Sequence, residues 1–246
     1  MEATGWIAAV IAACAVGLSK GGLAMVATLA VPVLSLTMSP VQAAGLLLPV
    51  YIVSDMGGLL AFRRVFDRSV LARALPGAAA GVALGWATAH VVPEWGVTLL
   101  VGVIGLVFAV NALIRPDLAS EPRPADYARG SLWGGLAGYT SFVSHSGAPP
   151  WQVYAQPLRL SPLGFAGTTT WFFAIVNLLK LPPYIALGQI SLASMRVAML
   201  LMPAALISVW VGLRIVRILP QKLFYTLITW GLLAISLRLI WQALAG

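Results

Sequence analysis

Charged residues are scarce in this sequence. Asp, Glu, Lys and Arg make up only 9% of its 246 residues, and only seven residues are acidic. A soluble domain of this length carries charge on about a quarter of its residues. The composition therefore argues against a soluble protein.

Residues that build disulfides, metal sites and catalytic centres are also few. Cys14 is the only cysteine, which excludes an internal disulfide and a cysteine metal site. The sequence has no His–Glu metal pair, no phosphate-binding loop, and no nucleophile followed by a base and an orienting acid. We therefore expect no enzymatic activity, no cofactor and no metal, and any transport must be passive or coupled to an ion gradient.

Long apolar runs, in contrast, are abundant. Hydrophobic residues make up 60% of the chain, and the apolar runs recur at about 20 residues, the length needed to cross a bilayer as a helix. A signal peptide would account for only one such run. The formal net charge of +8 is better explained by basic residues that flank membrane helices than by nucleic-acid binding. We predict an all-α polytopic protein in a lipid bilayer.

Five apolar segments precede a polar linker and five follow it. The linker, 115–130, is rich in proline and charge and is expected outside the bilayer. Residues 1–114 would form a first repeat and residues 131–246 a second. The segments are 5–19, 22–38, 40–61, 70–92 and 94–114 before the linker, and 130–144, 149–160, 162–180, 191–213 and 222–245 after it.

The two halves share the spacing of several punctuating residues. A Ser-Pro pair opens the third segment of each half, and it is a physical helix start because serine caps free amides and proline suits the first helical position. Repeated spacing of such residues predicts a duplication. The matched positions are Ser39 and Ser161, Pro40 and Pro162, Gly45 and Gly167, and Asp55 and Asn177.

Basic residues change sides between the halves. The loop after 40–61 carries four arginines, whereas the loop after 162–180 has only Lys180. Because basic loops are cytoplasmic, the repeats are predicted to be inverted, with the linker cytoplasmic and both termini extracytoplasmic. The basic residues then placed in the cytoplasm are Arg63, Arg64, Arg68, Arg73, Arg115, Arg123, Arg129, Arg159, Arg214, Arg217 and Lys222.

The first two segments of each half, taken together, must enter the membrane and leave it on the same side. Each has about 12–17 apolar residues, fewer than the ~20 of a full span. Each pair therefore forms either a re-entrant helical hairpin or two short, tilted spans, followed by three transmembrane helices. A helix of about 14 residues is roughly 21 Å long, so the tips of two re-entrant hairpins, Gly17–Gly22 and Ser144–Pro150, would meet inside the membrane.

The two tips carry the residues that we predict to bind a substrate. Opposed helix N-termini near the midplane would attract an anion, because each offers partial positive charge and unpaired N–H donors. Lys20 adds a cation, and the serines and His145 add donors. The alternative is that the glycines pack helices and the serines cap them. The predicted contacts are Ser19, Lys20, Gly21, Gly22, Ser144, His145, Ser146, Gly147, Thr168, Thr169 and Asn177.

Two titratable residues are candidates for proton coupling. Asp55 is the lone carboxylate well inside a span, where ionisable residues are costly and usually face a cavity or a partner. His145 can change charge near neutral pH. A simple polar contact for Asp55, and a hydrogen bond that braces the hairpin for His145, are the alternatives.

Three consecutive threonines at 168–170 ensure that at least one faces the bundle interior, although threonine often bonds back to the backbone.

Several stretches resemble the sulfite exporter TauE/SafE family of bacterial membrane proteins. They are GLSKGG and SPVQAAGLLLPVYIVSD in the first half, and SFVSHSGAPP and SPLGFAGTTTWFFAIVNLLKLPPYIALGQ in the second. The family usually has consecutive glycines in the second tip, where this chain has Ser146-Gly147-Ala148. The resemblance implies a secondary transporter in the bacterial inner membrane that exports sulfite or a small organosulfonate such as sulfoacetate.

Other functions are compatible with the same residues. An uncoupled anion channel or facilitator, or an importer of small organic anions, would use a similar site. A membrane scaffold or assembly factor would transport nothing, and substitutions in the tips would leave its function intact. The sequence leaves the identity of the anion, the coupling ion and the oligomeric state open.

Overall fold

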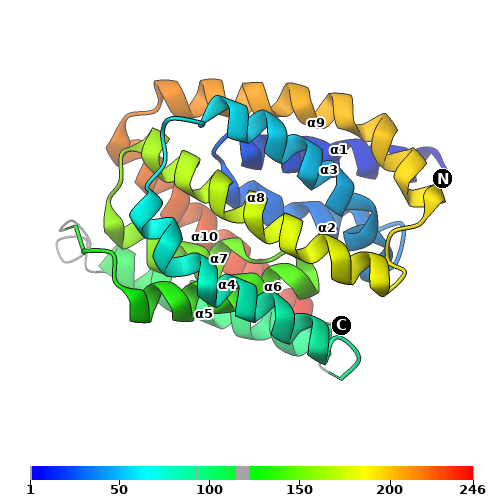
Figure 1. Ribbon diagram of the computed structural model, residues 1–246, viewed down its shortest axis with the longest axis horizontal. Helices are drawn as coiled ribbons and strands as arrows, with labels where there is room; N and C mark the ends of the chain where they lie inside the picture. The colour runs from blue at the N-terminus through cyan, green and yellow to red at the C-terminus, as the bar shows by residue number, and fades with distance from the viewer. Residues whose placement is uncertain (1, 92, 115–121, 246) are drawn as a thin grey trace. The chain divides into compact units, whose positions relative to one another are not determined.

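The computed structural model describes residues 2–91, 93–114 and 122–245, which form helices joined by short loops (Figure 1). Six of these helices are long and apolar enough to cross a membrane. The predicted all-helical polytopic fold is therefore confirmed. In chain order the elements are α1 (Ala3–Lys20), the 3-10 helix η1 (Ala24–Leu29), α2 (Ala30–Leu34), α3 (Pro40–Ala61), α4 (Arg68–Thr88), α5 (Glu94–Ile114), α6 (Tyr127–Ser144), α7 (Ala148–Ala155), the 3-10 helix η2 (Gln156–Leu158), α8 (Pro162–Ala186), α9 (Leu192–Ile218) and α10 (Gln221–Ala245).

The two Ser-Pro pairs begin helices as predicted. Ser39 Oγ accepts a hydrogen bond from the amide of Gln42 at 3.3 Å, and Ser161 Oγ accepts one from the amide of Gly164 at 3.1 Å. The proline after each serine lies at the first helical position, where a missing N–H costs nothing. These caps fix the starts of α3 and α8, the two helices that carry Asp55 and Asn177.

The second arm of each predicted hairpin is short and irregular. Segment 22–38 forms η1 and α2, and segment 149–160 forms α7 and η2. At about 2 Å per residue for 3-10 and 1.5 Å for α-helix, the arms are roughly 20 and 18 Å long, well short of a ~30 Å hydrocarbon core. In the first arm, Pro32 has no amide to donate to the carbonyl of Thr28, which limits α2. These lengths favour the re-entrant alternative, which stays a prediction.

The described chain forms two compact units. The first contains α1 to α3 with Ala166–Ile218, and the second contains Asp67–Phe165 with the C-terminal helix α10. Each unit therefore combines helices from both predicted repeats. The repeat boundaries, 1–114 and 131–246, stay a prediction.

In the first unit, α1 packs along α9 and α3 (Figure 1). The contact is close because two glycines of α1 face the backbone of α9. A Cβ at Gly17 would overlap the carbonyl oxygen of Ala205, and one at Gly21 would overlap that of Val209. Small residues four apart permit this approach between membrane helices. The packing holds the C-terminal end of α1 inside the unit.

In the second unit, α6 packs along α4 in the same manner, and α5 packs against α10. A Cβ at Gly77 would overlap the carbonyl oxygen of Ser131, and one at Gly81 would overlap that of Gly135. The helix before each predicted tip, α1 or α6, thus packs on the helix of the fourth segment of the other predicted repeat, α9 or α4.

We expect Gly81→Ala to lower the melting temperature of the purified protein, because its new methyl group would meet the backbone of α6. Gly231→Ala is a matched control, since Gly231 lies inside α10 with no atom within 4 Å of its Cβ position. Alanine is better than glycine in a helix by roughly 0.5–1 kcal/mol, so the control should melt at the same temperature or higher. Equal melting of both variants would contradict the tight α4–α6 contact.

Two matched glycines make reciprocal contacts within the first unit. A Cβ at Gly45 of α3 would overlap the carbonyl oxygen of Gln189, in the loop after α8. A Cβ at Gly167 of α8 would overlap the carbonyl oxygen of Val65, in the loop after α3. Each helix contacts the loop that follows its counterpart. This reciprocity supports the proposed duplication, and the inversion of the repeats stays a prediction.

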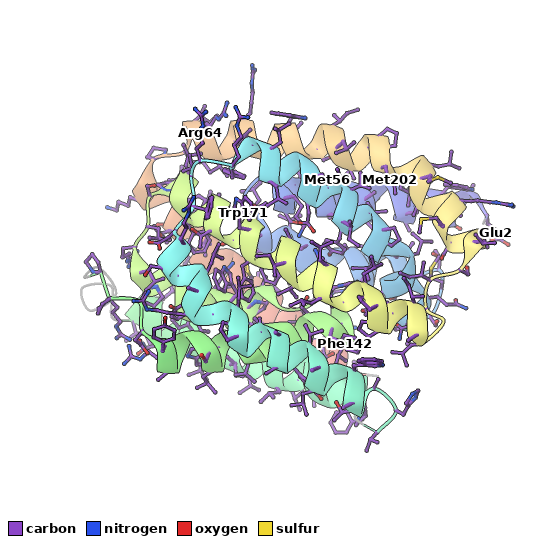
Figure 2. All side chains as sticks on the ribbon, viewed as in Figure 1. Glu2, Met56, Arg64, Phe142, Trp171 and Met202 are labelled. Atoms are coloured by element: carbon purple, nitrogen blue, oxygen red, sulfur yellow. The ribbon has the colours of Figure 1, made fainter. Side chains whose placement is uncertain are left out.

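Large apolar side chains cover the outward faces of the long helices (Figure 2). Met56 of α3, labelled in that view, is 66% exposed, and Ile207 and Trp210 of α9 are also exposed. Soluble monomers rarely expose contiguous apolar surface on this scale. These faces are suited to contact with lipid tails, and the chain is a multi-pass membrane protein.

Candidate functional site

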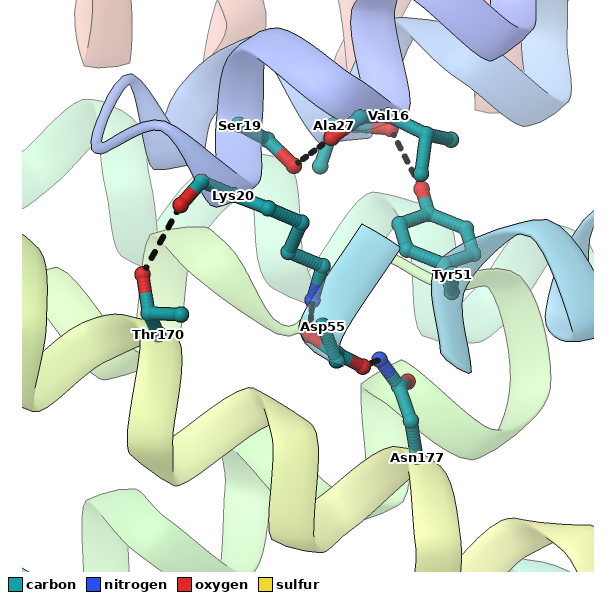
Figure 3. A network of polar contacts seen from close by, with 8 residues as sticks. All are labelled: Val16, Ser19, Lys20, Ala27, Tyr51, Asp55, Thr170 and Asn177. Atoms are coloured by element: carbon teal, nitrogen blue, oxygen red, sulfur yellow. Dashed lines mark hydrogen bonds and ion pairs between the residues drawn. The ribbon is translucent and has the colours of Figure 1, made fainter. Parts of the chain in front are cut away.

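The first predicted tip places Lys20 inside the first unit. The α-helix α1 ends at Lys20, and Gly22, with a φ of 117°, adopts a conformation that side-chain-bearing residues rarely take. The chain therefore reverses there, and the lysine side chain points towards α3 (Figure 3). Its Nζ lies 2.7 Å from Oδ1 of Asp55, and both side chains are 5% exposed. Lys20 and Asp55 form a buried ion pair.

Asn177 completes the environment of the Asp55 carboxylate. Its Nδ2 donates a hydrogen bond of 2.7 Å to Asp55 Oδ2, so each carboxylate oxygen has a close polar neighbour (Figure 3). Asp55 and Asn177 are matched positions of the two repeats, on α3 and α8. The structure therefore brings together Lys20, Asp55 and Asn177, which the sequence analysis proposes separately.

Lys180 is a further member of this cluster, although it is not among the predicted substrate contacts. It is fully buried, at 0% exposed, one helical turn after Asn177 on α8, and it interacts electrostatically with both Lys20 and Asp55. The sequence pattern places Lys180 at the end of segment 162–180 and counts it with the following loop, whereas α8 continues to Ala186 and holds Lys180 inside the helix. The buried cluster of Lys20, Asp55, Asn177 and Lys180, called here the lysine cluster, has two potential cations and one carboxylate.

Aromatic rings and the threonine run enclose Lys20. Its Nζ lies 5.1 Å from the centroid of the Tyr51 ring and 5.7 Å from that of Phe173, within the range of cation–π attraction. Thr170 donates a hydrogen bond of 3.3 Å to the carbonyl oxygen of Lys20 (Figure 3). Thr168 and Thr169 are also buried. The run thus faces the interior, and one of its hydroxyls holds the turn.

The second predicted tip lies in the second unit. Residue His145 ends α6 in the left-handed conformation, with a φ of 54°, and is buried. Ser144 Oγ donates to the carbonyl oxygen of Thr140, and Ser146 Oγ donates to that of Ser144. In the first tip, Ser19 Oγ likewise donates to the carbonyl of Val16 at 2.6 Å. The hydroxyl protons of these serines are thus engaged by backbone carbonyl oxygens, as is common for serine in membrane helices.

The helix N-termini at the tips offer fewer donors than the sequence analysis assumes. Gly147 lies at the N-cap of α7, so two of the first three helical residues are Pro149 and Pro150, which have no amide hydrogen. After Gly22 the chain continues as the 3-10 helix η1 rather than a regular α-helix. Side chains must therefore supply more of any anion binding than helix ends do.

Unsatisfied polar groups mark both units. Gln152 of α7 is 0% exposed, and neither atom of its amide group has a hydrogen-bond partner among the described residues. The hydroxyl groups of Tyr154 in the second unit and Ser54 in the first are also buried, and neither has a hydrogen-bond partner among the described residues. An unmade hydrogen bond of a buried group costs about 1–3 kcal/mol. In the sequence, the signal for Gln152 is an amide side chain within the apolar segment 149–160.

Comparison with known proteins identifies a family. A family model described as Sulfite exporter TauE/SafE matches residues 8–239, nearly the whole chain. No curated protein and no solved structure matches the chain. The matched range includes every member of the lysine cluster and both tips.

Proposed function

From the premise that the chain belongs to the sulfite exporter TauE/SafE family, a family of membrane transporters and not of enzymes, we propose that it is a secondary transporter of a small anion. Its substrate is sulfite or a small organosulfonate such as sulfoacetate, exported from the cytoplasm across the bacterial inner membrane. Export of sulfite or a related anion is what the family implies. The identity of the sulfonate and the direction of transport belong to the proposal.

The lysine cluster is the observation that carries this proposal. Ionisable side chains inside a membrane protein are costly and usually face a cavity or a partner, and this buried cluster brings two lysines and one carboxylate together. An oxyanion that enters beside Lys20 and Lys180 would accept charge-assisted hydrogen bonds from their amines, which are roughly twice as strong as neutral ones. Asn177 offers an amide donor in the same place. The cluster is thus suited to a small oxyanion.

The second tip, taken by itself, holds its own set of proposed substrate contacts in the second unit. Ser144, His145, Ser146 and Gly147 line the turn between α6 and α7. Gln152 adds an amide donor and acceptor that are buried with no partner among the described residues. Such groups are retained at a cost in stability, and contact with a polar substrate would satisfy them.

Efflux from proteoliposomes loaded with sulfite, sulfate, sulfoacetate or lactate tests the proposal. We expect saturable efflux of sulfite or sulfoacetate. Flux that rises linearly with concentration would instead indicate a channel. Uptake in intact cells without efflux would indicate an importer, and the absence of flux for all four anions would favour a scaffold.

Topology is tested by labelling with a membrane-impermeant thiol reagent. The Cys14→Ala substitution removes the native thiol. In this background, Ala3→Cys places a single thiol at the exposed start of α1, and Ala128→Cys places one at the exposed start of α6. The distribution of basic residues predicts that intact cells label at position 3 and not at position 128. Lysed cells should label at both. The reverse pattern in intact cells would contradict the proposed orientation.

A further inference from the structure

Two glutamines lie on one face of the short helix that follows the second predicted tip. Gln152 belongs to α7 and Gln156 caps its C-terminal end, where the backbone N–H of Gln156 donates to the carbonyl oxygen of Gln152. Side chains four residues apart on a helix are neighbours, with about 5–6 Å between their Cβ atoms. Gln152 is 0% exposed and Gln156 is 4% exposed. The second unit therefore buries two amide groups one helical turn apart.

A contact with α10 fixes the orientation of the Gln156 amide group. Thr229 Oγ1 donates its single proton to the carbonyl oxygen of Tyr225 at 3.0 Å, so it can only accept from Gln156. Gln156 Nε2 accordingly donates to Thr229 Oγ1 at 2.6 Å. The amide oxygen, Gln156 Oε1, is buried and has no hydrogen-bond partner among the described residues.

The Gln152 amide group makes no hydrogen bond at all within the described part of the chain. Both its Nε2 and its Oε1 are buried without a partner there. Most buried polar groups in native proteins are hydrogen-bonded, and leaving one unbonded is costly. Gln152, Gln156 and Thr229, called here the glutamine site, thus present two carbonyl oxygens and one amino group that no described residue satisfies.

These groups specify the chemistry of a ligand. A carbonyl oxygen only accepts hydrogen bonds, and an amide nitrogen only donates them. An anion whose oxygens are all acceptors, such as a sulfonate or sulfate, would satisfy the amino group and leave both carbonyl oxygens unbonded beside its negative charge. A small oxyanion that keeps one O–H satisfies both kinds of group. Hydrogensulfite, which coexists with the sulfite dianion near neutral pH, is such an anion.

A permanent cation lies at the same part of α10. Arg159 Cζ is 5.0 Å from the centroid of the Tyr225 ring, and Tyr225 precedes Thr229 by one helical turn. A guanidinium group stays protonated in proteins. Its charge favours an anionic ligand over a neutral one of the same shape.

We propose that the glutamine site binds a small oxyanion in its protonated, singly charged form, and that Gln152 distinguishes it from an anion without an O–H. The inference rests on the proposed function and deepens it, because it favours hydrogensulfite over an organosulfonate at this site. A glutamine Oε1 accepts the O–H of the anion, and Gln152 Nε2 donates to one of its other oxygens. No covalent bond changes, and the proton stays on the anion.

Gln152→Met separates anion recognition from stability. It keeps the approximate length of the side chain and removes an amide group that bonds to no described residue. The purified variant should therefore melt at the wild-type temperature or higher. Tyr154→Phe is the matched control, because it also removes a buried hydroxyl that has no partner among the described residues. Tyr154 lies two residues after Gln152, towards the opposite face of α7.

The measurement is calorimetric titration of the detergent-purified full chain with sulfite and with methanesulfonate, at one pH just below neutral. Methanesulfonate has the charge and approximate shape of hydrogensulfite, with a methyl group in place of the hydroxyl. Wild type and Tyr154→Phe should prefer sulfite by at least about tenfold, because a site that bonds a ligand hydroxyl rejects an analogue that lacks it. Gln152→Met should lose most of this preference.

Three results would overturn the inference. The first is an unchanged preference in Gln152→Met, and the second is a melting temperature of Gln152→Met below that of wild type, which would show that the amide is held by the protein or by ordered water. The third is equal affinity of wild type for the two anions, which would leave the proposed function intact. Binding of neither anion by wild type would contradict the proposed function as well.

Discussion

Lys20→Met is expected to reduce the apparent affinity for sulfoacetate by at least about 100-fold, which corresponds to about 2.8 kcal/mol. The substitution keeps the approximate length of the side chain and removes the cation that lies against Asp55, Tyr51 and Phe173. Without it, an incoming anion would meet the Asp55 carboxylate uncompensated. Binding to the purified protein and efflux from proteoliposomes measure the loss. Lys222→Met, at an exposed position, is the matched control.

The same substitution leaves Asp55 buried without its cation, so misfolding must be distinguished from loss of the site. Breaking a buried pair by removing one partner costs about 3–5 kcal/mol. The double variant Lys20→Met/Asp55→Asn removes both charges and should recover much of that stability, yet it should still fail to bind the anion. Normal transport by the double variant would show that Lys20 is structural and that the anion binds elsewhere.

Asp55→Asn is expected to destabilise the empty protein by a similar amount, because Lys20 would be left buried without its carboxylate. A bound anion can replace that missing charge. The rise in melting temperature on addition of saturating sulfoacetate should therefore be larger in Asp55→Asn than in wild type, since a ligand stabilises only the state that binds it. An equal rise in the two proteins would argue against an anion beside Lys20.

The hydrogen bond between Asp55 and Asn177 offers an internal control for this variant. The exchange Asp55→Asn/Asn177→Asp keeps one carboxylate and one amide in contact and moves the negative charge from α3 to α8. We expect the exchange to recover part of the stability lost in Asp55→Asn alone. If the exchanged variant melts no higher than the single variant, the carboxylate must lie on α3 to compensate Lys20.

The amino-acid composition, together with the proline, glycine and polar residues that separate the apolar runs, was sufficient for the membrane assignment and for the division into segments. Apolar runs of spanning length admit few other interpretations. The Ser-Pro pairs at 39–40 and 161–162 carry local signals that hold in any context, and both begin helices in the structure. Lys20 and Asp55 stood out for the same reason, because an ionisable side chain within an apolar run needs a partner.

What the tertiary structure decided is which of these groups meet. Membrane helices are apolar on the faces that touch lipid and on the faces that touch other helices, so hydrophobic periodicity does not show which way a side chain points. The sequence therefore treated Lys20 as a free ligand and left Lys180 aside. Only the packing of α1 and the α3 and α8 helices placed Lys20 against Asp55, Asp55 against Asn177, and Lys180 beside them. The balance of buried charge in this cluster is a property of three segments at once, and no single segment contains it.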